Sequence, residues 1–197
     1  MLPIADKVFI GILTVLAGFH IKNSQFSEVE YVRSNIDNRS YMVRKLPSKQ
    51  NAANLLAKVN RRLILLVEHM NVNIDEFEED DVKRLVSNFN PDNISEGTDK
   101  ANYTSYSVNK GEKIIFCLRS RDGNDKLIDI NTLMYVAIHE LGHLMTEEIG
   151  HPPAFWKNFR ILLEEAIDLG LYKAVNYAKK PVKYCGLTLK SSILNET

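Results

Sequence analysis

One apolar stretch, residues 131–148, constrains the fold of this chain most, because it carries the motif H-E-L-G-H at positions 139–143. The stretch contains no proline and is apolar on most faces, which predicts a helix buried in the protein interior. His139 and His143 are four residues apart, so they lie on the same face of that helix. Any fold that buries this helix must therefore hold two imidazoles and the carboxylate of Glu140 inside it.

These buried polar groups predict a metal ion. Imidazole and carboxylate groups are costly to bury without a partner. Two imidazoles can bind one zinc ion, which lowers the pKa of its bound water toward ~7, and Glu140 can take the proton without being a ligand. H-E-x-x-H on a helix is the sequence pattern of this chemistry. Gly142 is expected to let another backbone approach beside the ligands. Asp129 or Asn131 is expected to cap the start of the helix, and Gly150 to end it.

A catalytic zinc site usually has three protein ligands, and the sequence offers two kinds of third ligand. His151 follows the motif by eight residues and precedes the pair Pro152-Pro153, after which a new helix is predicted. Glu164 and Glu165, on that next helix, are the alternatives. The residues themselves leave both possibilities open.

The residues around His151 resemble a known family. The order H-E-L-G-H, seven residues, histidine, three residues and Phe155-Trp156 resembles the WLM and SprT-like group of small zinc metallopeptidases, over roughly residues 100–170. The resemblance implies an α+β, zincin-like domain that binds zinc (Zn²⁺) and hydrolyses protein or peptide substrates, with Glu140 as general base. It also implies a three-histidine metal site, made of His139, His143 and His151.

Aromatic residues have two expected roles, packing in the core and stabilising the oxyanion. Phe155 and Trp156 are expected to pack in the core against the motif helix rather than to contact substrate. Sites of this kind often use a tyrosine hydroxyl to stabilise the oxyanion, and Tyr184 is preferred for that role over Tyr172 and Tyr177. Core packing is the alternative for each of the three tyrosines.

The region before the motif predicts helices and short strands. A polar hairpin is expected within residues 27–44. Apolar residues recur at helical spacing between residues 51 and 70, and residues 73–90 predict a shorter helix with an acidic start that suits the helix dipole. Residues 103–108 and 113–119 favour strands, which places a small sheet directly before the motif helix.

Two strands carry further hypotheses. The strand that ends at Arg119 is expected to pair by its edge with an extended substrate. Residues 181–189 are expected to form a closing strand. Cys117 and Cys185, the two cysteines of the chain, are expected to be buried thiols rather than a disulfide, because no paired spacing links them.

The amino-terminal part predicts a hydrophobic segment, residues 1–25, ahead of one metallopeptidase domain, residues 26–197. The fourteen residues 8–21 are apolar apart from Thr14, His20 and two glycines, and they would span about 21 Å as a helix, short of the ~30 Å hydrocarbon core. A membrane anchor is preferred, which makes the protein membrane-associated. A cleaved signal peptide and a soluble helix remain alternatives.

Charge limits the possible partners. Lysine plus arginine equals aspartate plus glutamate at 25 each, so no nucleic-acid partner is expected. Residues 37–44, together with the tail 181–189, resemble metallopeptidases encoded by large DNA viruses of algae and protists. That resemblance implies a place in the infected cell or the virion. It also leaves open a second function, that of a membrane-associated, minor capsid-type protein that keeps the fold and has capsid neighbours as partners.

Overall fold

The structure is a computed structural model that describes residues 28–98, 104–191 and 193–195. This part of the chain contains four α-helices, seven short strands and two 3₁₀ helices. In chain order these are β1 (Val29–Arg33), β2 (Ser40–Arg44), α2 (Lys49–Val72), η1 (Ile74–Glu76), α3 (Glu79–Asn88), β3 (Ile94–Glu96), β4 (Tyr106–Val108), β5 (Lys113–Phe116), α4 (Ile130–Met145), α5 (Pro153–Asp168), β6 (Val182–Tyr184), β7 (Leu187–Leu189) and η2 (Ile193–Asn195).

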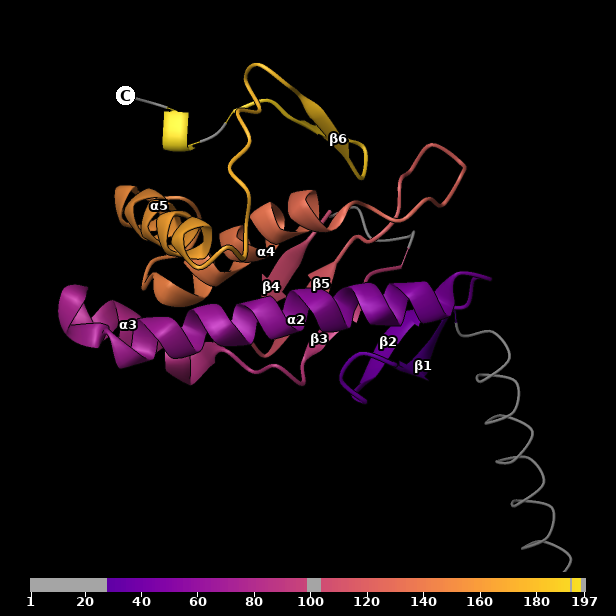
Figure 1. The fold of residues 1–197 in the computed structure, drawn as a ribbon, viewed down its shortest axis with the longest axis horizontal. Helices are drawn as coiled ribbons and strands as arrows, with labels where there is room; N and C mark the ends of the chain where they lie inside the picture. The colour runs from indigo at the N-terminus through magenta and orange to yellow at the C-terminus, as the bar shows by residue number, and fades with distance from the viewer. Residues whose placement is uncertain (1–27, 99–103, 192, 196–197) are drawn as a thin grey trace, which may run out of the picture.

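The α+β class is therefore confirmed, and the order of elements follows the prediction closely. Helix α2 runs along the domain and contacts the β1–β2 hairpin, β3 and all three other helices (Figure 1). The predicted hairpin within residues 27–44 is the antiparallel pair β1–β2. The helix predicted over residues 73–90 is divided into η1 and α3.

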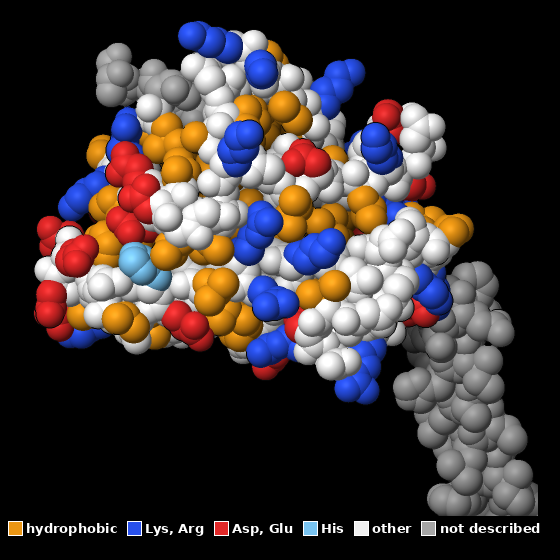
Figure 2. All heavy atoms as spheres, viewed as in Figure 1, with side chains coloured by type: hydrophobic (Ala, Val, Ile, Leu, Met, Phe, Trp, Pro, Cys, Tyr) orange, Lys and Arg blue, Asp and Glu red, His pale blue; other side chains and the backbone are white. Residues whose placement is uncertain are grey.

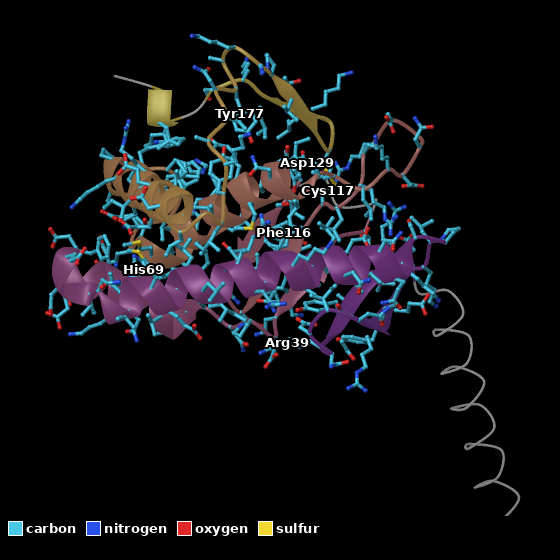
Figure 3. The ribbon with its side chains drawn as sticks, viewed as in Figure 1. Arg39, His69, Phe116, Cys117, Asp129 and Tyr177 are labelled. Carbon is cyan, nitrogen blue, oxygen red and sulfur yellow. A yellow bond between two sulfur atoms is a disulfide. The ribbon has the colours of Figure 1, made fainter. Side chains whose placement is uncertain are left out.

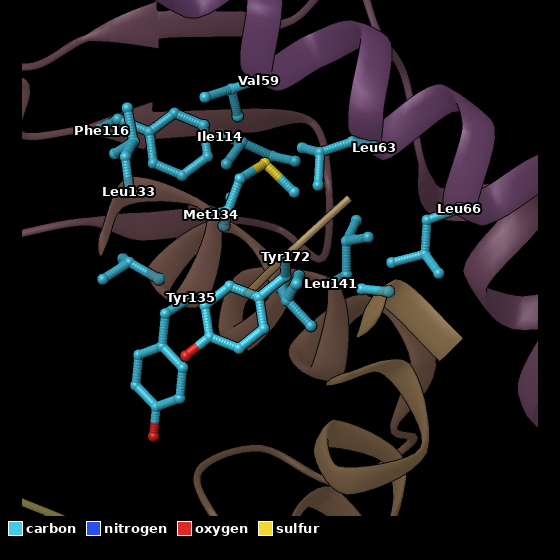
Figure 4. Close-up of a cluster of buried hydrophobic side chains, with 14 of the residues drawn as sticks. Val59, Leu63, Leu66, Ile114, Phe116, Leu133, Met134, Tyr135, Leu141 and Tyr172 are labelled. Carbon is cyan, nitrogen blue, oxygen red and sulfur yellow. The ribbon is translucent and has the colours of Figure 1, made fainter. Parts of the chain in front are cut away.

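Helix α4 is the predicted motif helix, and it is the centre of the core. Twelve of its sixteen residues are buried, as expected for a helix that is apolar nearly all round. Figure 4 shows side chains of α4 among those of α2 and β5. The labelled residues of this cluster are Val59, Leu63 and Leu66 of α2, Ile114 and Phe116 of β5, Leu133, Met134, Tyr135 and Leu141 of α4, and Tyr172.

Both ends of α4 are held by side chains. At its start, the Asp129 carboxylate accepts hydrogen bonds from the backbone N–H groups of Asn131 and Thr132, so Asp129 is the N-cap. At its end, Gly150 does not terminate the helix as predicted, because α4 already stops at Met145.

Side chains from other parts of the fold donate hydrogen bonds to carbonyl groups at the end of α4. Asn88 donates to the Leu144 carbonyl at 3.0 Å, and Arg84 donates to the Met145 carbonyl at 2.8 Å. The ammonium group of Lys110 donates to the next carbonyl, that of Thr146, at 2.8 Å. With these groups satisfied, the chain leaves the helix without a glycine cap.

The small sheet has the strand order β3-β5-β4, with β3 parallel and β4 antiparallel to the central strand β5. The hypothesis that the strand ending at Arg119 offers its edge to substrate is therefore wrong. Strand β5 ends at Phe116 and is hydrogen-bonded on both sides. Strand β4 is one of the two end strands of this sheet, and it contacts α4.

The membrane prediction falls on residues that the structure leaves undescribed. The hydrophobic segment 1–25, including residues 8–21, lies outside the described ranges. None of the described helices is both long enough and apolar enough to cross a bilayer. Association with a membrane through residues 8–21 stays a prediction.

Cys117 and Cys185 form a disulfide, so the prediction of two free thiols was wrong. The cysteines are 68 residues apart in sequence, and no local pattern brings them together. Cys117 directly follows β5, and Cys185 lies in the turn of the β6–β7 hairpin, which formed where a single closing strand was predicted. Since β6 and β7 pair only with each other in the described sheets, the disulfide adds a covalent cross-link between this hairpin and the segment after β5.

Removal of the disulfide is expected to lower the free energy of unfolding by about 2–4 kcal/mol, because a cross-link that closes a long loop restricts the unfolded chain. Urea unfolding of the Cys117→Ala, Cys185→Ala double variant measures this difference. Wild-type protein under reducing conditions is the control and should unfold at nearly the midpoint of the variant. An unchanged midpoint in both would contradict the stabilising role.

Gly111, in the turn between β4 and β5, permits a close approach of two segments. Its φ is +108°, and a Cβ atom there would lie 2.0 Å from the Asn88 carbonyl oxygen. We expect Gly111→Ala to cost about 3 kcal/mol or more of stability, from strain and overlap together. Gly123→Ala is the matched control, because φ is +87° and no atom lies within 4 Å. That variant should cost about 1 kcal/mol, and equal midpoints in urea would contradict the overlap.

Candidate metal centre

Three histidine side chains converge at one end of α4. His139 and His143 lie one helical turn apart on α4, and His151 lies in the loop that leads to α5. The Nε2 atoms of His139 and His151 are 3.1 Å apart, and one ring nitrogen from each of the three residues lies within 4.8 Å of the others. Two nitrogen ligands of one tetrahedral zinc ion, each at ~2.1 Å, lie about 3.4 Å apart. The three histidines therefore fit a zinc ion in spacing and in donor type.

Aromatic packing fixes the position of His151. Pro152 and Pro153 begin α5 immediately after it. The ring of Phe155, fully buried on α5, lies 4.9, 4.5 and 4.6 Å from the rings of His139, His143 and His151, respectively. Phe155 is thus a core residue, as predicted, and it supports all three imidazoles.

Two sequence predictions about this packing were wrong. The nearest described atoms to a Cβ at Gly142 belong to side chains and not to another backbone. A Cβ atom there would lie 3.0 Å from the Phe155 ring and 3.4 Å from the Phe159 Cβ, so Gly142 makes room for aromatic side chains of α5. Trp156 is not a core residue, because 43% of it is exposed, on the side of α5 that faces a cleft.

The imidazoles are held in the form that binds metals. Burial, together with the neighbouring His143 and His151, lowers the pKa of His139 to about 3. Burial, with His151 and Lys110 nearby, lowers the pKa of His143 to about 4. Both rings are therefore neutral at neutral pH, and a neutral ring nitrogen is the ligand that a metal ion requires.

Glu140 is buried beside the histidines. Burial raises its pKa to about 7, while hydrogen bonds from the hydroxyl and the backbone N–H of Ser107 act in the opposite direction. A carboxylate with a pKa near 7 can both accept and release a proton at neutral pH. Ser107 lies on β4, and the sequence singled out this strand without singling out this residue.

The glutamates proposed as alternative ligands lie elsewhere. Glu165 forms a hydrogen-bonded pair with His69 of α2, with 2.8 Å between the carboxylate oxygen and Nε2. Glu164 is exposed. His69 is partly buried and is labelled towards one end of α2 in Figure 3. Among the described residues, His139, His143 and His151 form the one group of three side chains with metal-ligand geometry.

The tyrosines considered for oxyanion binding are all buried. The Tyr184 hydroxyl lies 2.6 Å from Ser105 Oγ and donates to the Cys117 carbonyl at 3.0 Å. Burial is the main cause of its raised pKa, and Glu140 adds to it. Tyr172 and Tyr177 pack around Tyr135 instead. The oxyanion role of Tyr184 stays a prediction, and it requires the hydroxyl to leave the Cys117 carbonyl.

Two clefts meet at His139. The first, of about 430 Å³, is lined by residues 105–107 around β4, by Lys110 and by the three histidines with Glu140. The second, of about 750 Å³, lies between α5 and the segment that follows the β6–β7 hairpin. His139 lines both clefts, so the candidate metal centre lies between them.

Comparison with known proteins identifies a family that this sequence matches. A family model described as the WLM domain matches residues 36–190. An uncharacterised protein of Acanthamoeba polyphaga mimivirus is 37% identical over 180 residues, which is 89% of this chain and 90% of that protein. An uncharacterised protein of Invertebrate iridescent virus 6 is 36% identical over 34% of this chain and 38% of its own length. The crystal structure of Wss1 from Saccharomyces cerevisiae matches with a TM-score of 0.47 and 20% identity, over 64% of this chain and 86% of that one.

Proposed function

The chain belongs to the WLM domain family, as the resemblance of its motifs indicated, and on that premise we propose that it is a zinc-dependent metallopeptidase. The observation that supports the proposal most is the meeting of three imidazoles with one buried carboxyl group, that of Glu140. In this assignment His139, His143 and His151 hold the metal. The substrates are proteins or peptides.

The residues of the site divide the work. Zinc, when bound, supplies a Lewis acid that polarises a peptide carbonyl and makes water more acidic. Glu140 takes a proton from the attacking water and passes it to the leaving amine. Ser107 holds the Glu140 carboxylate by two hydrogen bonds and so orients it. The Phe155 ring packs against all three imidazoles and so keeps them in place.

Strand β4 is the proposed binding edge for an extended substrate. It is an end strand of its sheet and borders the cleft that contains Glu140 and the three histidines. Main-chain groups of an end strand can pair with a peptide laid alongside. A peptide bound in this way would pass directly over Glu140.

Removal of the metal tests the function. Full-length protein is expected to cleave a denatured, fluorescently labelled casein, and treatment with 1,10-phenanthroline should lower the rate by at least about a hundredfold, since the metal contributes directly to the reaction. Addition of zinc after removal of the chelator should restore the rate, and addition of magnesium is the control that should not. Cleavage that persists in metal-free protein would contradict a metallopeptidase.

A further inference from the structure

The larger cleft has an aromatic base. Tyr135 of α4 and Phe159 of α5 line its inner part, and their rings meet edge to face with centroids 5.3 Å apart. The exposed ring of Trp156 continues this surface towards His151, at 5.5 Å between ring centroids. Leu189 of β7 lines the other side. An aromatic surface of this kind suits the methylene groups of a substrate side chain.

The lysine and arginine residues of the lining carry positive charge. Lys157 and Arg160 of α5 and Lys190 after β7 all line this cleft, and no described aspartate or glutamate does. Arg160 is held in place by donation to the Ile193 carbonyl at 2.5 Å. Lys157 approaches Glu78 at 3.6 Å, but both side chains are more than half exposed, so this ion pair is weak. Lys190 is exposed and forms no ion pair within the described part of the chain.

The smaller cleft beside the metal centre does not share this concentration of positive charge. The smaller cleft is lined by Lys110 together with Glu140 and Glu148, so its charges are mixed. The face shown in Figure 2 also carries Lys, Arg, Asp and Glu side chains together. The whole chain has no net charge. A cleft lined by three cations and, among the described residues, by no aspartate or glutamate is therefore a local feature next to the candidate metal centre.

We propose that this cleft binds an acidic side chain of the substrate, with glutamate as the residue that fits best. The aromatic base would contact the methylene groups of the glutamate, and the cations would contact its carboxylate. Because the cleft opens from His139 on one side of the metal centre, the preference applies to one side of the scissile bond. This inference rests on the proposed peptidase function and adds the class of substrate to it.

Binding of matched peptides tests the preference without catalysis. Three ten-residue peptides carry the same uncharged fluorophore around a central Ala-Phe pair. One has two glutamates on the amino-terminal side of the pair, one has them on the carboxyl-terminal side, and one has glutamine at all four positions. Fluorescence anisotropy measures their binding to the full-length, zinc-loaded Glu140→Gln protein.

One glutamate peptide is expected to bind about tenfold more tightly than the glutamine peptide, and the other within about twofold of it. Added salt at ~0.5 M should remove most of the difference, because salt screens exposed charges. Equal binding of all three peptides, or equal strengthening by glutamate on both sides, would overturn the proposal.

A charge reversal locates the effect in the cleft. Lys190→Glu, added to the same protein, is expected to reduce the preference at least about fivefold. Lys183→Glu is the matched control, because Lys183 is an exposed residue of the same hairpin and lines neither cleft. An equal loss of preference in both variants would overturn the proposal, since it would show a general field rather than a site.

Cleavage of the same peptides by wild-type protein separates this inference from the proposed function. Cleavage with no preference for glutamate would support the peptidase and overturn the acidic subsite. Selective binding of one glutamate peptide with no cleavage of any protein substrate would support the subsite and contradict the peptidase.

Discussion

Replacement of Glu140 with glutamine is expected to lower kcat/KM for protein cleavage by about a thousandfold or more, while the zinc content stays unchanged. Glutamine has nearly the shape of glutamate but cannot carry a proton between water and the leaving amine, and positioned acid–base groups contribute about 10²–10⁴-fold. Glu140 is not one of the three residues that converge as ligands, so the metal should remain bound. Metal analysis and peptide cleavage on the same preparation measure both quantities.

Glu148→Gln is the control for this experiment. Glu148 is an exposed residue that lines the same cleft as Glu140, so the same chemical change is made at its rim. The kcat/KM of this variant should stay within about threefold of the wild-type value, as expected for an exposed charge. A Glu140→Gln protein that still cleaves at the wild-type rate would remove Glu140 from the mechanism. Zinc binding without cleavage by wild-type protein would instead favour the structural, capsid-type function.

His151→Ala is expected to weaken zinc binding at least a hundredfold. Loss of a residue that only supports a ligand costs about 10–100-fold in metal affinity, and loss of a ligand should cost at least as much. His151 supplies the one ligand that does not come from α4, and its Nε2 lies 3.1 Å from that of His139. Titration of metal-free protein with zinc against a competing chelator measures the affinity. Wild-type protein should bind one zinc ion per chain.

His69→Ala is the matched control for the loss of an imidazole. His69 pairs with Glu165 on another face of α5, so its loss should leave the zinc affinity within about twofold. Zinc affinity that survives the His151→Ala substitution would contradict the three-histidine site. Loss of affinity in both variants would point to a folding defect, which urea unfolding of the two proteins would reveal.

Several differences between prediction and structure concern contacts between distant segments. The sequence contains no spacing that pairs Cys117 with Cys185, because they meet through the placement of a hairpin. It gave no sign that Arg84, Asn88 and Lys110 would hold the last carbonyl groups of α4. In each case neither partner stands out in its own stretch of sequence, and the interaction forms because the fold brings the two residues together.

The exposure of aromatic residues is a second matter that the sequence left undecided. Phe155 and Trp156 are adjacent on an amphipathic helix, and both are large and apolar. The helical rotation of about 100° per residue sends Phe155 to the histidines and Trp156 to the larger cleft. Which of the two faces the core depends on where α4 lies, and this is a property of the packed domain.

The sequence by itself determined the helix that carries His139, Glu140 and His143. The apolar periodicity and the four-residue spacing are local properties, and helical geometry places residues four apart on one face. The sequence also indicated His151 as the preferred third residue through a motif close to α4. The tertiary structure decided that β4 rather than β5 is an end strand, that Ser107 holds Glu140, and that a cationic cleft adjoins the metal centre. These features depend on which distant segments meet, and that is settled when the core packs and not by any short stretch of residues.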